Sequence, residues 1–280
     1  MKSNSPKIYL LPNLMTAGNL FCGFLAILMI FEGMRDPQSG VAPYYKAIAL
    51  ILGACVFDLL DGRVARIRGQ ESLFGREFDS LADIVSFGIA PALLVMDIVL
   101  NDFSHRLGWL TAFGYLLCGG MRLARFNCMA ANPDKSGNKD FMGFPIPAAA
   151  GLIASLTLLM LWLNEGEKEV GPWKYGLLFL MWLLSFLMLS EYQYPSFKRL
   201  NWRTRRTLPW VFVIILVAVC AVIFWHVVPA IIFTSYLIYG GVRPWISRKW
   251  RREIEDDGDE PDIEVMKDPS DDEGEDESVA

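Results

Sequence analysis

The stretch VFDLLDGRVARIRGQESLFGREFDSLAD, residues 56–83, places four aspartates between two strongly apolar regions of the chain. Asp58 and Asp61 are three residues apart, and Asp79 and Asp83 are four apart, so each pair lies on one face of a helix. The connection between the two predicted helical ends is short, so these helices are expected to be antiparallel neighbours whose acidic faces converge. Four carboxylates in a low dielectric repel one another strongly unless positive charge lies among them.

The same stretch suggests two sources of that positive charge. Its arginines supply part of it and are suited to hold phosphate. Hard divalent cations supply more, and all-oxygen ligands suit magnesium, manganese or calcium better than zinc or copper. Ordinary ion pairs between the aspartates and the arginines are the alternative, but ionisable residues at a membrane boundary usually have a function.

Small residues in the stretch are consistent with a bound ligand. Gly62, Ala65 and Gly75 would let a ligand approach the backbone closely. On their own they would equally indicate close packing of membrane helices. The aspartates therefore carry the prediction of a site, and the small residues only support it.

The rest of the chain predicts an all-α, polytopic membrane protein. Of its 280 residues, 53% are hydrophobic and the mean hydropathy is +0.32, which is too apolar for an ordinary soluble domain. A membrane-spanning helix needs ~20 apolar residues to cross ~30 Å of hydrocarbon. By this rule about eight segments qualify, the last being short: 10–31, 45–65, 79–100, 107–126, 146–163, 175–190, 208–226 and 228–239.

Positive charge is unevenly distributed between the connections. Lys and Arg cluster after the second, sixth and last predicted spans, whereas the connections in between are poorer in them. Basic loops tend to stay in the cytoplasm. Both termini and the aspartate stretch are therefore expected on the cytoplasmic side of the inner (cytoplasmic) membrane.

The C-terminal region, residues 253–280, differs from everything before it. It contains fifteen Asp or Glu and one Lys, a charge of −14, whereas residues 1–252 carry +9. With almost nothing apolar to bury, it is expected to be a disordered acidic tail. The basic remainder is expected to form one membrane domain that faces anionic lipid or an anionic substrate.

The spacing within the opening stretch also resembles a family signature. It reads D-x2-D-G-x2-A-R-x8-G-x3-D-x3-D from Asp58 to Asp83. This matches, position for position, the signature of the CDP-alcohol phosphatidyltransferase family. The resemblance implies a membrane enzyme that uses two divalent cations, Mn²⁺ or Mg²⁺, and a CDP-linked lipid, and that releases CMP.

The resemblance also implies roles for the residues of the signature. Asp83 would be both a metal ligand and the base that takes the proton of the acceptor hydroxyl. The other metal ligands would be Asp58, Asp61 and Asp79. The residues that line the nucleotide and diphosphate site would be Gly62, Ala65, Arg66 and Gly75.

Further stretches resemble one branch of the family, the bacterial and archaeal phosphatidylserine synthases. They are LPNLMTAGNLFCGFLAI (11–27), MRLARFN (121–127), FMGFPIPAAAG (141–151) and LSEYQYPSFKRLN (189–201). This branch implies CDP-diacylglycerol as donor and L-serine as acceptor, with phosphatidylserine and CMP as products. Its members form dimers, which implies a homodimer in the membrane lipid, and no nucleic-acid partner is expected.

Residues outside the signature are candidates for binding the substrates. Asn13 and Thr16 could contact the nucleotide from the first span, although Asn13 could instead cap that helix. Arg122 and Arg125 could pair with a serine carboxylate or anchor the fourth span at the cytoplasmic surface. The candidates for lipid phosphate, or alternatively for the anionic membrane surface, are Lys198 and Arg199.

Two other functions are compatible with parts of the pattern. The same chemistry with glycerol phosphate or inositol phosphate as acceptor, or with an archaeal ether lipid as donor, would use the same signature. A cation transporter could use four acidic side chains as a transport site, but no second broken helix mirrors them in the sequence. Measuring CMP release against ion flux in liposomes distinguishes the two classes.

Overall fold

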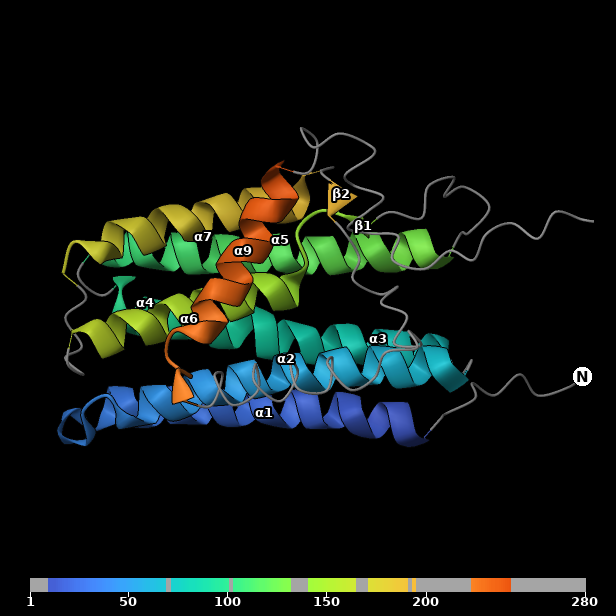
Figure 1. Cartoon of the computed structure of the whole chain (residues 1–280), viewed down its shortest axis with the longest axis horizontal. Helices are drawn as coiled ribbons and strands as arrows, with labels where there is room; N and C mark the ends of the chain where they lie inside the picture. The colour runs from blue at the N-terminus through green and yellow to red at the C-terminus, as the bar shows by residue number, and fades with distance from the viewer. Residues whose placement is uncertain are drawn as a thin grey trace, which may run out of the picture.

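The computed structural model is a bundle of long helices that run side by side, with one helix crossing it obliquely (Figure 1). The structure describes residues 10–68, 72–100, 103–131, 141–164, 171–190, 193–194 and 223–242. Within this part the helices are α1 (Leu10–Arg35), η1 (Pro37–Ser39), α2 (Ala42–Arg68), α3 (Leu73–Asp83), η2 (Ile84–Ile89), α4 (Ala90–Ile98), α5 (His105–Ala131), α6 (Ile146–Leu163), α7 (Trp173–Leu189) and α9 (Val228–Val242). Two-residue strands, β1 (Phe141–Met142) and β2 (Gln193–Tyr194), pair antiparallel.

The prediction of an all-α, polytopic membrane protein is confirmed. Apart from the two short strands, every regular element in the described residues is helical. The predicted fourth span corresponds to α5, and the sixth and the last correspond to the shorter apolar helices α7 and α9. The predicted seventh span, 208–226, lies almost entirely outside the described residues. Within the described residues, four stretches are long and apolar enough to cross a membrane: Asn13–Arg35, Ala42–Gly62, Leu73–Ile98 and Ile146–Leu163.

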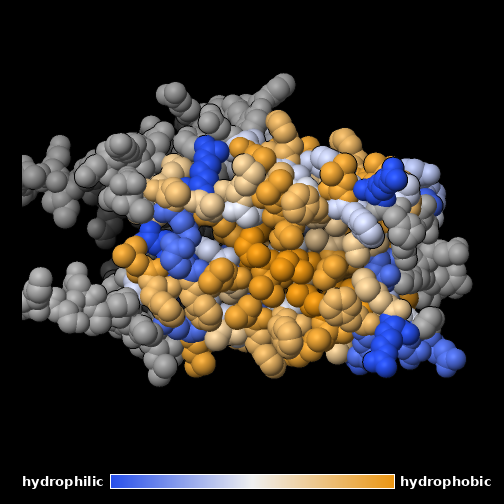
Figure 2. Space-filling model, turned by 180° about the vertical axis from the view of Figure 1, so that it is seen from behind, coloured by the Kyte–Doolittle hydropathy of each residue, from blue (hydrophilic) through white to orange (hydrophobic). Residues whose placement is uncertain are grey.

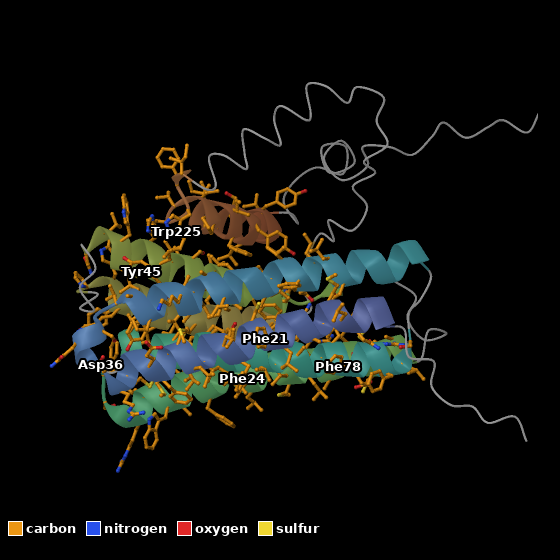
Figure 3. All side chains as sticks on the ribbon, turned by 90° about the horizontal axis from the view of Figure 1, so that it is seen from below. Phe21, Phe24, Asp36, Tyr45, Phe78 and Trp225 are labelled. Atoms are coloured by element: carbon orange, nitrogen blue, oxygen red, sulfur yellow. The ribbon has the colours of Figure 1, made fainter. Side chains whose placement is uncertain are left out.

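The first helix shows how the sequence separates lipid from protein. On α1, Phe21 and Phe24 are exposed and point away from the bundle (Figure 3). Asn19, Ala26 and Ile30 recur at helical spacing on the opposite face and are fully buried. Burying these aromatic side chains inside the bundle would not stabilise the protein further, because the lipid is as apolar as the protein interior.

One helix start differs from the sequence prediction, and one alternative role for a residue is excluded. The third span begins at Leu73 and not at Asp79, because Ser72 caps the helix: its Oγ accepts a hydrogen bond from the Gly75 N–H at 3.0 Å. The first helix begins at Leu10, so Asn13 lies inside it, and the alternative role of Asn13 as a cap is wrong. The polar start of the third span therefore extends beyond the apolar segment that predicted it.

The third span contains a π-helical turn, η2, directly after Asp83. Within it the Ala90 N–H donates to the Val85 carbonyl, five residues back. Pro91 follows and has no N–H to offer to the Phe87 carbonyl. The Tyr115 hydroxyl of α5 donates to that carbonyl instead, at 3.0 Å. The turn is thus satisfied from a neighbouring helix, and such turns are frequent at functional sites.

The surface matches a protein embedded in a bilayer. Figure 2 shows an apolar band across the middle of one face, with hydrophilic residues gathered toward its two ends. Asp36 marks one end of the bundle in Figure 3, and Phe78 lies toward the other. The aspartate stretch belongs to the end that carries Phe78, because α2 finishes there and α3 starts there.

Candidate active site

Three of the four predicted aspartates form a cluster between α2 and α3. Asp58, Asp61 and Asp79 each present a carboxylate oxygen, and these oxygen atoms all lie within 4.8 Å of one another. Asp61 is only 6% exposed, and the other two are partly buried. The antiparallel helices therefore bring the two acidic faces together, as the spacing of the aspartates predicted.

The first helix supplies polar side chains that hold the aspartates. Thr16 Oγ1 donates to Asp61 Oδ2 at 3.2 Å, and Asn19 Nδ2 donates to Asp83 Oδ1 at 3.1 Å. Asn19 and Asp83 are both buried. Helix α1 thus fixes one carboxylate of α2 and one of α3 from the same face.

Asp83 is placed differently from the other three. It is 5% exposed, lies outside the three-carboxylate cluster, and ends α3 where the π-helical turn begins. In that turn Ser86 Oγ donates to the Asn19 carbonyl at 2.9 Å, and Gly23 of α1 lies so close to Ser86 that a Cβ there would collide with it. The close contact of the two backbones holds Asn19 against Asp83.

The predicted nucleotide-binding residues are partly brought together. A Cβ at Gly75 would lie 3.3 Å from Asn13 Oδ1 and 3.2 Å from Ser72 Oγ, so α1 and α3 meet at this glycine. Gly62 follows Asp61 directly in α2, next to the acidic cluster. Ala65 and Arg66 belong to the last turns of α2, but their side chains lie outside the described part of the structure.

The predicted acceptor residues divide into two groups. Arg122 is 8% exposed, whereas Arg125 is partly exposed and donates from Nη1 to the Leu189 carbonyl at the end of α7, at 3.4 Å. Lys198 and Arg199 lie outside the described residues. Of these four residues, Arg122 alone is a buried cation in the described part of the chain.

The donor chemistry of the cluster fits a hard divalent cation, because carboxylate oxygens are the ligands that magnesium and manganese prefer. Several buried polar atoms of α1 and α5 also lack hydrogen-bond partners in the described part of the chain. They include Asn13 Nδ2, Arg122 Nε and Asn127 Oδ1. Buried polar atoms are nearly always paired in folded proteins, so this set indicates a place that a polar ligand completes.

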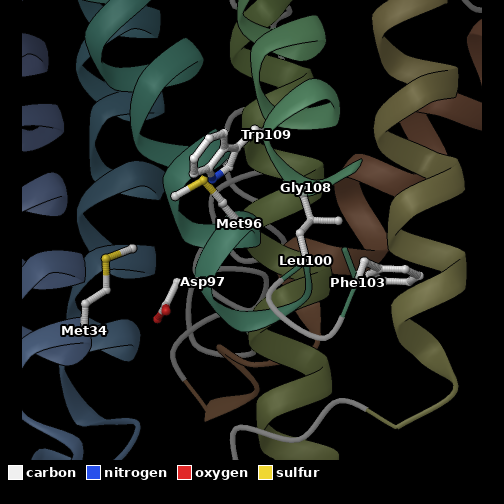
Figure 4. A pocket seen from close by; sticks show the side chains of 7 residues that line it. All are labelled: Met34, Met96, Asp97, Leu100, Phe103, Gly108 and Trp109. Carbon is white, nitrogen blue, oxygen red and sulfur yellow. The ribbon is translucent and has the colours of Figure 1, made fainter. Parts of the chain in front are cut away.

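A cavity of about 250 Å³ lies elsewhere, at the opposite end of the bundle (Figure 4). Its lining includes Met34, Asp97 and Trp109. Met34 follows Asn19 on α1 by fifteen residues, which is ~22 Å along a helix. The cavity is therefore separate from the aspartates.

The sequence model of CDP-alcohol phosphatidyltransferases matches residues 9–238 of this chain. The chain belongs to this family. The resemblance that the aspartate spacing indicated is thus confirmed, and the match extends into α9 as far as residue 238, which the motifs quoted above did not reach.

Similar proteins point to one branch of the family. A CDP-diacylglycerol--serine O-phosphatidyltransferase of Helicobacter pylori strain J99 is 36% identical over 242 residues, which is 85% of this chain and 92% of that protein. An archaetidylserine synthase of Methanothermobacter thermautotrophicus is 36% identical over 187 residues, 66% of this chain and 69% of that protein. A CDP-diacylglycerol--serine O-phosphatidyltransferase of Mycobacterium leprae is 35% identical over 193 residues, 68% and 59% of the two chains.

Sequence reasoning missed two polar residues that the structure places at the site. Asn19 is the partner of Asp83, and Asn127 donates from Nδ2 to Glu77 Oε2 at 3.2 Å and to Ser80 Oγ at 2.9 Å. Asn19 is an amide within the first apolar span and Asn127 directly follows the fourth, which was the available signal. Neither partner could be assigned, because each contact joins segments that are far apart in the sequence.

Proposed function

We propose that this chain transfers the phosphatidyl group of CDP-diacylglycerol to the hydroxyl of L-serine, giving phosphatidylserine and CMP. The main support is the 36% identity, over 92% of its length, to a protein named CDP-diacylglycerol--serine O-phosphatidyltransferase. The archaeal relative is also named for serine but for a different lipid. The names therefore support the acceptor more strongly than the donor, and an ether-lipid donor is the principal alternative.

We assign the acidic cluster to divalent cations. Asp58, Asp61 and Asp79 would hold two ions, Mg²⁺ or Mn²⁺, with Asp83 as an additional ligand. The support is the closeness of the three carboxylate oxygens and the hardness of the donor set. When bound, such ions neutralise the diphosphate of the lipid nucleotide and stabilise the leaving CMP.

The chain's own residues would orient the acceptor and move its proton. Because Asn19 donates to Oδ1 of Asp83, we assign the proton of the serine hydroxyl to Oδ2 of the same carboxylate. The serine oxygen then forms a bond to the phosphorus that carries diacylglycerol, and the bond from that phosphorus to the CMP oxygen breaks. Gly62, Ala65, Arg66, Gly75, Asn13 and Thr16 are assigned to the nucleotide and diphosphate.

We further propose that the site faces the cytoplasm from the inner membrane, with 1–252 as the membrane domain and 253–280 as a separate acidic tail. The support is the clustering of Lys and Arg in alternate connections. Serine would then enter from water, while the acyl chains stay in the bilayer beside the exposed apolar faces of the helices. Lys198 and Arg199 are assigned to lipid phosphate, and the enzyme is proposed to act as a homodimer.

One experiment tests the central proposal. Purified protein is incubated with CDP-diacylglycerol and Mn²⁺ or Mg²⁺, and CMP release is measured with and without L-serine. We expect release that needs both serine and metal and that stops when EDTA is added. Glycerol 3-phosphate, inositol phosphate and an ether-linked CDP-lipid serve as comparison substrates, and faster release with another acceptor would overturn the assignment of serine.

A further inference from the structure

Arg122 differs from an ordinary membrane-anchoring arginine. Its side chain is 8% exposed, and its Nε is buried without a hydrogen-bond partner in the described part of the chain. Arg125, one turn further along α5, instead donates to a helix-end carbonyl. A buried guanidinium with an unused donor is costly unless an anion completes it.

Two hydrogen bonds fix the position of Arg122 along the bundle axis relative to the aspartates. Tyr115 of α5 donates to the Phe87 carbonyl at 3.0 Å, and Asn127 of α5 donates to Ser80 Oγ at 2.9 Å. The two segments are antiparallel, so Arg122, which lies between these two contacts on α5, falls at the level of Asp83.

Helix α9 brings a tyrosine to the same place. The Phe233 ring of α9 packs where a Cβ at Gly151 of α6 would be, which holds α9 against α6. One turn on, the Tyr236 ring lies 5.6 Å from that of Phe144, just before α6 begins. The start of α6 in turn contacts α5, where Ile146 packs against Gly119, one turn before Arg122. These contacts place Tyr236 near the start of α6, beside the part of α5 that carries Arg122.

We propose that Arg122 binds the carboxylate of the amino-acid acceptor and that Tyr236 of α9 lines the same subsite. This inference rests on the proposed function. The acceptor hydroxyl must reach Asp83, and in serine the carboxylate is only two carbons from the hydroxyl oxygen. A guanidinium at the height of Asp83 is therefore suitably placed, and its fork of N–H donors matches a carboxylate.

The subsite makes the enzyme selective for a carboxylate-bearing acceptor. Ethanolamine has the amine and hydroxyl of serine but no carboxylate, so it would leave the buried guanidinium without its anion. Loss of a hydrogen bond to a charged group typically weakens binding by ~10–100-fold. We expect Arg122→Gln to raise the KM for L-serine by about this factor and to reduce the preference for serine over ethanolamine similarly.

The test separates acceptor binding from the other roles open to a buried arginine. CMP release is measured over a range of L-serine and ethanolamine, and metal-dependent binding of CDP-diacylglycerol is measured independently. For Arg122→Gln we expect CDP-diacylglycerol affinity within about twofold of wild type, and Arg122→Lys should recover part of the serine affinity. Arg106→Gln, at the exposed start of α5, is the matched control and should leave all three quantities unchanged.

The outcomes that overturn the inference are distinct. Weaker CDP-diacylglycerol binding with an unchanged KM for serine would assign Arg122 to the diphosphate, and an unchanged serine preference would remove it from the acceptor site. If Arg122→Gln does not fold, Arg122→Lys and Tyr236→Phe decide in its place, since Tyr236→Phe keeps the ring against Phe144. Failure of the wild-type protein to use serine at all would instead refute the proposed function.

Discussion

Aspartates are buried at both ends of the bundle, but the groups that surround them differ. Asp61 and Asp83 are 6% and 5% exposed at one end, and Asp97 is 8% exposed at the other. The Tyr44 hydroxyl, itself fully buried, donates a hydrogen bond to Asp97. At the active-site end, by contrast, three carboxylates present oxygen atoms within 4.8 Å of one another, and Asp83 lies close by.

The comparison teaches that burial alone does not identify a functional carboxylate. An acidic residue within a membrane span is functional by default, and this rule would select Asp97 as readily as Asp83. The two kinds of aspartate differ in whether neighbouring protein groups compensate the buried carboxylate. Asp97 accepts a hydrogen bond from the tyrosine of a neighbouring helix, whereas the clustered carboxylates repel one another and need positive charge among them.

The largest effect is expected from neutralising the clustered carboxylates. Asp58→Asn or Asp79→Asn keeps the shape of the side chain but removes a charged metal ligand. We expect serine-dependent CMP release to fall close to background at saturating metal, with the protein still folded in detergent. Turnover above about a tenth of the wild-type rate in either variant would exclude the two-ion account.

Asp97→Asn is the matched control, because it makes the same substitution at similar burial at the other end. If burial alone made these carboxylates essential, the control would lose activity as well. We expect it to retain CMP release at temperatures where it stays folded.

Asp83→Asn should be nearly as damaging but for a different reason. A general base contributes typically ~10²–10⁴-fold to rate. The substitution should therefore lower turnover by about that factor while metal-dependent binding of CDP-diacylglycerol persists, because the three-carboxylate cluster is intact. Loss of binding together with turnover would show that Asp83 acts mainly as a ligand.

The sequence predicted the parts of this site that depend on local geometry. The three- and four-residue spacings placed the aspartates on shared faces, and three of them form the cluster. The contact of Thr16 with Asp61 was not predicted, because the sequence assigned Thr16 only to the nucleotide. The start of the third span was misjudged, because Arg76 and Glu77 make its first turns too polar to resemble a membrane helix. The capping residue Ser72 would have indicated the correct start of this helix.

Contacts between distant segments could not be predicted. Asn19 and Asp83 are 64 residues apart, and Tyr44 and Asp97 are 53 apart. Each pair depends on how helices pack, which hydropathy leaves undetermined. The same applies to Tyr236, whose position follows from the contact between Phe233 and Gly151.

A moderate effect on stability, and none on turnover, is expected when the hydrogen bond between Tyr44 and Asp97 is removed. Tyr44→Phe removes the hydrogen bond to a buried carboxylate, which typically costs ~1–3 kcal/mol. The thermal midpoint in detergent should fall by a few degrees, with the KM for serine unchanged. Tyr44→Phe combined with Asp97→Leu should restore part of the loss, since replacing both partners by apolar groups is often nearly neutral. A loss of CMP release without a loss of stability would give Asp97 a role in turnover.

The smallest effect on activity is expected from deleting the acidic C-terminal region, although it holds the most carboxylates. Residues 253–280, which lie outside the described residues, carry a charge of −14 but no apolar pattern that could bury any of it. If a carboxylate contributes to activity because it is buried in the bundle, and not because many carboxylates are present, the tail should be dispensable. A chain ending at Arg252 should then keep its specific activity within about twofold and its thermal midpoint in detergent. The assay belongs at saturating metal, because an acidic segment can also bind divalent cations loosely and change the free concentration. A collapse of activity or folding in the shortened chain would mean that these carboxylates pack against the membrane domain, and the contrast between enclosed and solvated acids would then fail.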